Sequence, residues 1–274
     1  MSEKAFQCTL HRDEQGVTTY TGEDGAIYYS SIELAQYAMA SYQAYLITEK
    51  HTWLDDSVLH IEKFVNMAQS YKESELTVLN TYPIALYKID HPWPTSLGFG
   101  VAISLLVRLY ELLKKEEYLI FAKKLAQNFF IKVDNGGVLR KINNLMIFEE
   151  YPTKELSGVL NGHIFGLWGL KDLGKYDQLY ETHFNNLSIN LAENLKVWNG
   201  NFWSLYDASH LVGKRKNYAS AHYHLLHVKM IMVMYKLTGN AVFANFAETL
   251  IRQKFGVWSR VKALFVKVFF RLFN

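Results

Sequence analysis

The chain has few of the residues that cross-link or interrupt a fold. Among its 274 residues there is one cysteine, Cys8, so no disulfide can form within the chain. Only four prolines and 16 glycines occur, and no low-complexity linker separates them. No run reaches the ~18 uncharged apolar residues of a membrane-spanning helix, and the polar start lacks the apolar segment of a secretory signal. We therefore expect a cytoplasmic protein.

Basic and acidic residues are also nearly balanced in number. The formal net charge is +3 at pH 7, which is too small to predict a nucleic acid as a partner. Apolar residues, by contrast, make up half of the chain, and 15% of all residues are aromatic. Aromatic rings can fill a core or stack on the C–H faces of sugars, and composition alone does not separate these uses. A chain of this length buries roughly 75% of its unfolded surface, so the core needs no metal.

Hydrophobic periodicity predicts a mainly helical chain. Apolar residues recur at spacings of three and four in eight segments, at about 32–49, 53–71, 97–113, 117–131, 156–173, 177–196, 217–238 and 240–255. Between them, we expect β-hairpins at 76–90 and 136–150 and a short strand at 202–207. Antiparallel helix pairs that close in a ring form an α/α barrel, or toroid, with the hairpins lining a cleft. The sequence contains no repeat of fixed period, so an open solenoid of stacked repeats is disfavoured.

The last 18 residues differ from the rest. We expect one domain at 1–256, followed at 257–274 by a basic amphipathic helix with four basic residues and no acid. Its apolar stripe comprises Trp258, Val261, Leu264, Phe265, Val268, Phe269, Leu272 and Phe273. Such a helix is typical of association with an anionic membrane surface, here the inner face of the cell membrane. The alternative is a last helix packed on the body of the protein.

Two neighbouring segments carry groups suited to acid–base and binding chemistry. In the EEYPT segment, two adjacent carboxylates stand beside Tyr151 at the end of a predicted hairpin, and Pro152 fixes the local backbone. A carboxylate there can act as a general base, although such a run also occurs in ordinary solvated loops. Eight residues after the proline-threonine pair, Asn161 can hydrogen-bond a sugar hydroxyl or cap a turn.

Three further segments contain histidine, tyrosine or basic residues. Tyr206 precedes an aspartate and His210, which suits a proton relay and equally a strand at the rim of a cleft. His224 and His227 share one face of a predicted helix, but zinc needs three or four ligands and no further ligand is evident. We expect no metal site. Arg215, in a basic triplet, can neutralise a substrate carboxylate or lie in a solvated loop.

The order of these motifs resembles the C-terminal region of heparan sulfate D-glucuronyl C5-epimerases and their bacterial relatives. The motifs are EEYPT at 149–153, VLNG at 159–162, YD-x-x-H at 206–210 and YH-x-x-H at 223–227. Upstream, IELAQY at 32–37 and AISLLVR at 102–108 resemble helices of the family. The resemblance covers roughly residues 28–250. The chain has no room for the additional β-rich domain of the animal enzymes, so it is similar to a compact bacterial form.

The resemblance implies an isomerase that inverts C5 of a hexuronic acid residue in a polysaccharide or oligosaccharide. It places four residues in the catalytic site, namely Glu150, Tyr151, Tyr206 and Tyr223. We add six substrate-binding candidates, namely Tyr29, Asn161, His210, Arg215, His224 and His227. Some family positions differ. Phe99, Val101, Lys229 and Met230 stand where the family has glutamines, and Ser209 stands where it has an arginine. These differences put the identity of the substrate in doubt more than the reaction.

Inversion at C5 needs a base on one face of the sugar, a proton donor on the other, and a neutralised carboxylate. We assign Glu150 or Tyr151 to one face and Tyr223 to the other, with Tyr206 as a support or relay. No cofactor is expected, because the proton leaves without a hydride. Alternatives are a uronate polysaccharide lyase, a glycoside hydrolase that pairs Asp207 with Glu150, and a non-catalytic polysaccharide-binding or assembly protein. A homodimer is left open.

Overall fold

The computed structural model describes residues 11–256 together with residues 258, 261–262 and 265–266. Helices dominate this part of the chain. They are α2 (Ser31–Thr48), α3 (His51–Asn66), α4 (Ser96–Leu113), α5 (Glu116–Ala126), α6 (Leu160–Leu173), α7 (Gln178–Asn194), α8 (Ala221–Thr238) and α9 (Ala241–Phe255). All eight predicted helices are present. The second, expected to reach residue 71, ends at Asn66, because the following residues turn into a strand.

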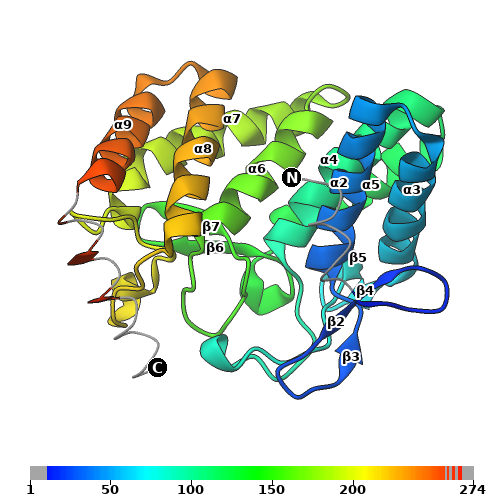
Figure 1. Cartoon of the computed structure of the whole chain (residues 1–274), viewed down its shortest axis with the longest axis horizontal. Helices are drawn as coiled ribbons and strands as arrows, with labels where there is room; N and C mark the ends of the chain where they lie inside the picture. The colour runs from blue at the N-terminus through cyan, green and yellow to red at the C-terminus, as the bar shows by residue number, and fades with distance from the viewer. Residues whose placement is uncertain (1–10, 257, 259–260, 263–264, 267–274) are drawn as a thin grey trace.

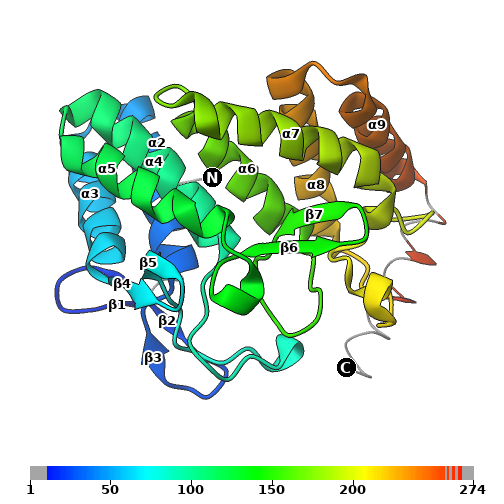
Figure 2. The ribbon, with the colours of Figure 1, turned by 180° about the vertical axis from the view of Figure 1, so that it is seen from behind.

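Consecutive helices pack as four antiparallel pairs (Figures 1 and 2). Helices α2, α4, α6 and α8 form the inner layer, in which α4 packs against both α2 and α6. Helices α3, α5, α7 and α9 each pack on the outside of the preceding inner helix. This arrangement confirms the predicted α/α toroid.

The connections within pairs and between pairs differ in length. Each inner helix joins its outer partner through two to four residues, for example Glu49 and Lys50 between α2 and α3. The connections between pairs are the long segments 67–95, 127–159 and 195–220. All of them lie at the same end of the ring, at the bottom of Figure 1. The inner helices also begin at this end, so their N-terminal N–H groups face the long loops.

Short strand pairs occupy the long-loop end. A three-stranded sheet contains β1 (His11–Arg12), β2 (Thr18–Thr21) and β3 (Ile27–Tyr28), and two hairpins are formed by β4 (Ala68–Tyr71) with β5 (Ser74–Val78) and by β6 (Leu139–Ile142) with β7 (Leu145–Phe148). The hairpin predicted at 136–150 is therefore confirmed.

The hairpin predicted at 76–90 and the strand predicted at 202–207 are not formed as expected. The first hairpin lies earlier, at 68–78, and the segment after it is closed by isolated bridges, Asn80 with Trp93 and Ile84 with Ile89. Pro83 lacks the N–H that a continuous ladder would need at that point. Within 202–207 there are likewise only isolated bridges, from Ser204 and Leu205.

Helix α4 is the centre of the core. It has the length and mean hydropathy, 1.6, of a membrane-spanning helix, yet 72% of that window is buried inside the protein. Its apolar character therefore serves packing against its neighbours. Gly100 lets α4 approach α6 closely, since a Cβ there would lie 2.1 Å from the carbonyl oxygen of Phe165.

Most of the amphipathic helix predicted at 257–274 lies outside the described residues. Of those described, Trp258, Val261 and Phe265 are exposed, by 84%, 43% and 67%. Val266 instead packs beside a buried cluster that includes Trp203. The domain boundary after residue 256 stays a prediction.

Candidate active site

The loop that follows β7 contains two buried carboxylates with different surroundings. Glu149 forms an ion pair with Arg140, whose Nε lies 2.6 Å from Oε1. Its other oxygen accepts hydrogen bonds from the backbone N–H of Gly158, at 2.8 Å, and from the Ser157 hydroxyl. Burial raises the pKa of Glu149, and Arg140 and these hydrogen bonds oppose the rise. Glu149 therefore holds the loop in place and has no oxygen left for a substrate.

Glu150 is 3% exposed and forms no ion pair within the described part of the chain. One of its oxygens accepts a hydrogen bond from Asn161 Nδ2, at 2.9 Å, and the Tyr151 hydroxyl and the Gly162 N–H also donate to the carboxylate. Burial raises the pKa of Glu150 to about 7, against the effect of these donors. A carboxyl group that is half ionised near neutral pH can both accept and release a proton, as general acid–base catalysis requires.

The first turn of α6 is built around Glu150. Asn161 and Gly162 are its second and third residues, and a Cβ on Gly162 would lie only 2.5 Å from the Cβ of Glu150. A glycine is therefore needed for the helix start to approach the carboxylate. The partial positive charge of a helix N-terminus favours the ionised carboxylate, so Glu150 remains able to lose its proton despite its burial.

An aromatic cluster lies on one side of Glu150. The rings of Tyr87 and Tyr151 stack with centroids 4.3 Å apart and an interplanar angle of 16°. Trp93 packs 5.6 Å from Tyr151 and 5.4 Å from Tyr82. Tyr82 is anchored by a 3.0 Å hydrogen bond between its hydroxyl and that of Ser30. These contacts tie the 79–95 loop to the loop that carries Glu150.

Two further tyrosines come from the other end of the chain. Tyr206 lies in the 195–220 loop and Tyr223 in the first turn of α8, and their rings meet edge to face at 4.8 Å. Their hydroxyls are hydrogen-bonded to each other. Burial raises the pKa of both, and the nearby charge of Glu150 raises both further. Burial and Glu150 also raise the pKa of Tyr151. The structure thus brings the four predicted catalytic residues together around one carboxyl group.

The other candidates lie in different environments. Asn161 is buried beside Glu150, and its Oδ1 is shielded from solvent without a hydrogen-bond partner among the described residues. His210 lies in the short helix η5 (Ser209–Val212), where burial and then Lys216 lower its pKa, and its Nδ1 is also shielded and unpaired in the described structure. Arg215 is exposed on the loop that follows. The first two groups remain available to a substrate.

Three predicted substrate-binding residues have structural surroundings instead. Both ring nitrogens of His224 are bonded to protein groups, to Ser204 at 2.8 Å and to the Leu250 carbonyl at 2.9 Å. His227 is fully buried, and its Nδ1 lies 3.1 Å from the same serine hydroxyl. The hydroxyl of Tyr29 donates to Asp13 at 2.6 Å, on the side of the β1–β2 strands. The polar atoms of His224 and Tyr29 are thus bonded to the core and to another loop, whereas Nε2 of His227 is buried without a partner among the described residues. Substrate binding by these three residues stays a prediction.

Asp207 also has a supporting role. Its Oδ1 accepts from the N–H and hydroxyl of Ser209, at 3.1 and 2.7 Å, and its Oδ2 accepts from Asn217 Nδ2 at 2.7 Å. These bonds fix the 195–220 loop. They leave Asp207 poorly placed as the second carboxylate of a glycoside hydrolase.

Tyr87, which stacks on Tyr151, was not among the predicted site residues. It lies in the segment 76–90, for which a hairpin was predicted. The density of aromatic residues around Pro83 was the available signal.

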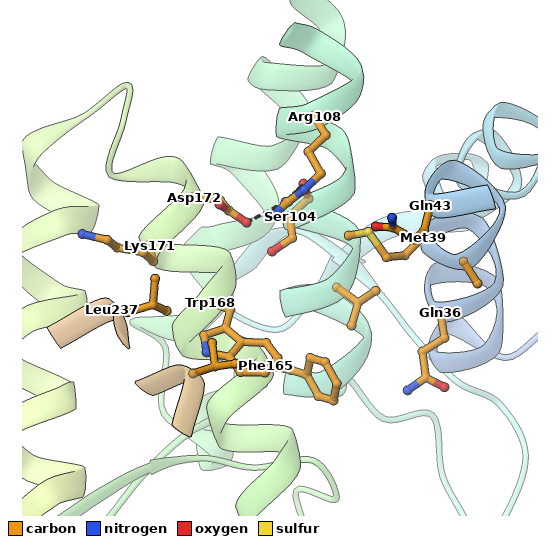
Figure 3. A pocket seen from close by; sticks show the side chains of 13 residues that line it. Gln36, Met39, Gln43, Ser104, Arg108, Phe165, Trp168, Lys171, Asp172 and Leu237 are labelled. Carbon is orange, nitrogen blue, oxygen red and sulfur yellow. Dashed lines mark hydrogen bonds and ion pairs between the residues drawn. The ribbon is translucent and has the colours of Figure 1, made fainter. Parts of the chain in front are cut away.

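A separate cavity of about 510 Å³ lies between the inner helices (Figure 3). The residues of α6 that line it come later in the helix than Asn161. Phe165 and Trp168 line it from α6, and Arg108 and Asp172 form an ion pair at 2.7 Å on its wall. In the part of the chain that the structure describes, no three His, Cys, Asp or Glu side chains are arranged to hold a metal ion.

Comparisons with known sequences point to one family. A sequence model described as D-glucuronyl C5-epimerase C-terminus matches residues 69–252, about two thirds of the chain. A D-glucuronyl C5-epimerase of Caenorhabditis elegans is 27% identical over 179 residues, which are 60% of this chain and 29% of that protein. An uncharacterized protein of Methanocaldococcus jannaschii is 28% identical over 173 residues, which are 60% of this chain and 54% of that protein. The chain therefore spans less than two thirds of either relative.

Similar solved structures share the helical toroid. A cellobiose 2-epimerase from Bacillus thermoamylovorans has a TM-score of 0.60 at 14% identity, over 82% of this chain and 59% of that one. A D-mannose isomerase has a TM-score of 0.60 at 12% identity, over 90% of this chain and 65% of that one. A GH76 α-mannanase from Bacteroides thetaiotaomicron has a TM-score of 0.58 at 16% identity, over 90% and 64%. At these identities the similarity concerns the fold alone.

Proposed function

Since the chain belongs to the D-glucuronyl C5-epimerase C-terminus family, we propose that it is a carbohydrate epimerase that inverts C5 of a hexuronic acid residue. The substrate would be a residue of the D-glucuronate or L-iduronate type in a polysaccharide or its precursor. One observation carries this proposal. Glu150, with a pKa raised by burial to about 7, is surrounded by Tyr151, Tyr206 and Tyr223.

In the proposed reaction, the ionised carboxylate of Glu150 takes the proton from C5, and the electron pair of the C–H bond moves into the substrate carboxylate. Tyr223 then donates its hydroxyl proton to C5 from the opposite face. Burial keeps the phenols protonated, because it raises their pKa values. The cycle closes when a proton returns from Glu150 to the Tyr223 phenolate, through Tyr206 or through solvent. Proton transfer by such positioned groups contributes ~10²–10⁴-fold to a rate.

The arrangement argues against two of the alternatives. A lyase starts with the same proton abstraction and then protonates the leaving oxygen at C4, so the products of the reaction have to separate it from an epimerase. A hydrolase needs two free carboxyl groups about 5–9.5 Å apart, whereas Glu149 and Asp207 are both committed to holding loops. A protein that only binds polysaccharide does not need an enclosed carboxyl with a raised pKa, whose burial destabilises the fold.

Solvent isotope exchange tests the proposal. The protein is incubated in deuterated water with uronate-containing polysaccharides, and deuterium at C5 is measured by NMR. We expect deuterium at C5 in both epimers without chain cleavage. An ultraviolet-absorbing unsaturated end would identify a lyase, new reducing ends would identify a hydrolase, and no exchange with any uronate polymer would refute the proposed activity.

We also propose that the protein acts at the cytoplasmic side of an anionic membrane, through its C-terminal segment. Trp258, Val261 and Phe265 are exposed, and their spacing of three and four places them on one face of a helix. The segment also carries four basic residues, each of which adds ~1 kcal/mol of attraction to an anionic surface. Lys262 Nζ lies 4.9 Å from the centre of the Phe202 ring, and Phe202 packs against the same small cluster as Tyr206 and Tyr223.

A further inference from the structure

Tyr87 belongs to none of the family motifs, yet it is part of the same site. Its ring stacks on Tyr151, and its hydroxyl oxygen is shielded from solvent and has no hydrogen-bond partner among the described residues. Leaving a buried hydroxyl unpaired costs stability, so an unpaired hydroxyl in an enclosed site points to a ligand atom as its partner.

The surroundings of this hydroxyl determine its protonation state. Burial raises the pKa of Tyr87 well above 10, and the charges of Asp207 and Glu150 raise it further. Tyr87 is therefore a neutral phenol at any physiological pH, and it meets a bound substrate as a hydrogen-bond donor. Its ring stacks on that of Tyr151, the residue that follows Glu150 in the chain. Tyr87 therefore lies in the same site as the carboxyl group that is proposed to take the C5 proton.

We infer that Tyr87 is a further catalytic residue, which donates a hydrogen bond to the carboxylate of the reacting uronate. This inference rests on the proposed function. A base that removes the C5 proton must lie against C5, and C5 carries that carboxylate. A donor next to the base therefore reaches the carboxylate oxygens. These oxygens gain negative charge when the proton leaves, and a fixed donor at such a position stabilises the transition state.

The charge balance in the site is consistent with a neutral donor. The charge of Glu149 is compensated by Arg140, and Asp207 is surrounded by donors from its own loop. Glu150 becomes neutral in the same step that places negative charge on the substrate.

The loop that carries Tyr87 is held before substrate arrives. Ile84 and Ile89 exchange two backbone hydrogen bonds, at 2.9 and 3.1 Å, on either side of η1 (Ala85–Tyr87). Trp93 Nε1 donates to the Tyr82 carbonyl at 2.9 Å. A donor fixed in this way loses little conformational freedom when the substrate binds.

The test compares Tyr87→Phe with Tyr82→Phe, since each loses one hydroxyl from the same loop. The probes are a glucuronate-containing hexasaccharide and its carboxyl-reduced counterpart, in which each carboxylate is a CH₂OH group. For Tyr87→Phe we expect the kcat for C5 deuterium exchange to fall by ~10²–10³-fold, as for loss of one oxyanion donor. The KM should rise less than the kcat falls, and the melting temperature should not fall. The ratio of the Kd values for the reduced form and the hexasaccharide, which measures the preference for the carboxylate, should decrease.

The control variant separates catalysis from structure. Tyr82→Phe breaks the hydrogen bond to Ser30, so its melting temperature should fall while exchange and carboxylate preference persist. Wild-type exchange and preference in Tyr87→Phe would overturn the inference, as would a wild-type protein that binds both hexasaccharides equally. Failure of the epimerase proposal looks different, because the wild type would then bind the hexasaccharide without incorporating deuterium. In that case the binding preference alone decides the role of Tyr87.

Discussion

Replacing Glu150 by glutamine should make the protein inactive and, above neutral pH, more stable. The side chain keeps its size and an oxygen that can accept from Asn161. In the folded state the pKa of Glu150 is raised from 4.5 to about 7 by burial, and 1.36 kcal/mol corresponds to one pKa unit. Ionising the buried carboxyl therefore costs roughly 3 kcal/mol of folding free energy at high pH, and glutamine avoids this cost.

The sign of the pH dependence follows from the direction of the shift. A carboxyl group whose pKa is higher in the folded than in the unfolded state favours folding below the unfolded pKa, near 4.5. This contribution is lost as the pH rises through about 7. Wild type and Glu150→Gln should therefore have similar stability at pH 4 and differ most at pH 8–9. The difference of roughly 3 kcal/mol corresponds to a rise of about 5–10 °C in melting temperature.

Thermal unfolding by circular dichroism between pH 4 and pH 9 measures the effect, and C5 exchange is measured in parallel. Glu149→Gln is the matched control, because it neutralises the adjacent buried carboxyl that is paired with Arg140. Breaking a buried ion pair costs ~3–5 kcal/mol, so this variant should melt lower at neutral pH. If the difference in melting temperature between Glu150→Gln and wild type is the same at pH 4 and at pH 9, Glu150 has an ordinary pKa.

Three further predictions concern the site and the C-terminal segment. Tyr151→Phe and Tyr223→Phe should keep their circular dichroism spectra and each lose ~10²–10⁴-fold in C5 exchange; unchanged exchange in both would make these tyrosines structural. Gly162→Ala should push Glu150 aside, since its Cβ would lie 2.5 Å from that of Glu150, and should cost ~1–3 kcal/mol by chemical denaturation together with activity; full activity would contradict the described contact. A version that ends at Gly256 should no longer sediment with anionic vesicles, and equal sedimentation of both versions would rule out the membrane role.

The helices could be predicted because their signal is local. An apolar residue every three or four positions indicates which face of each helix is buried, and all eight segments are helical. The ends were less predictable. The segment after Asn66 continues a helical pattern in sequence, but it pairs with β5 through backbone hydrogen bonds that periodicity does not encode.

The candidate site was predictable only where motifs mark it. Glu150 and the tyrosines of the EEYPT, YD-x-x-H and YH-x-x-H motifs were identified, and they meet in space. Both ring nitrogens of His224 are bonded to protein groups, and histidines three positions apart on a helix give the same sequence pattern in a core as in a site. Tyr87 was missed, because only the tertiary contacts of an irregular loop bring it to Tyr151.

The difference in loop length between the two ends of the ring determines where the chain can accept insertions. The four helix pairs turn back through two to four residues at one end, whereas all the long segments lie at the other. Lengthening a long loop costs little, about 0.6 kcal/mol of closure entropy for each doubling, and leaves the helix contacts untouched. The long-loop end, which carries the candidate site, can thus accept insertions that reshape its surface, while insertions in the tight turns would separate helices that must pack.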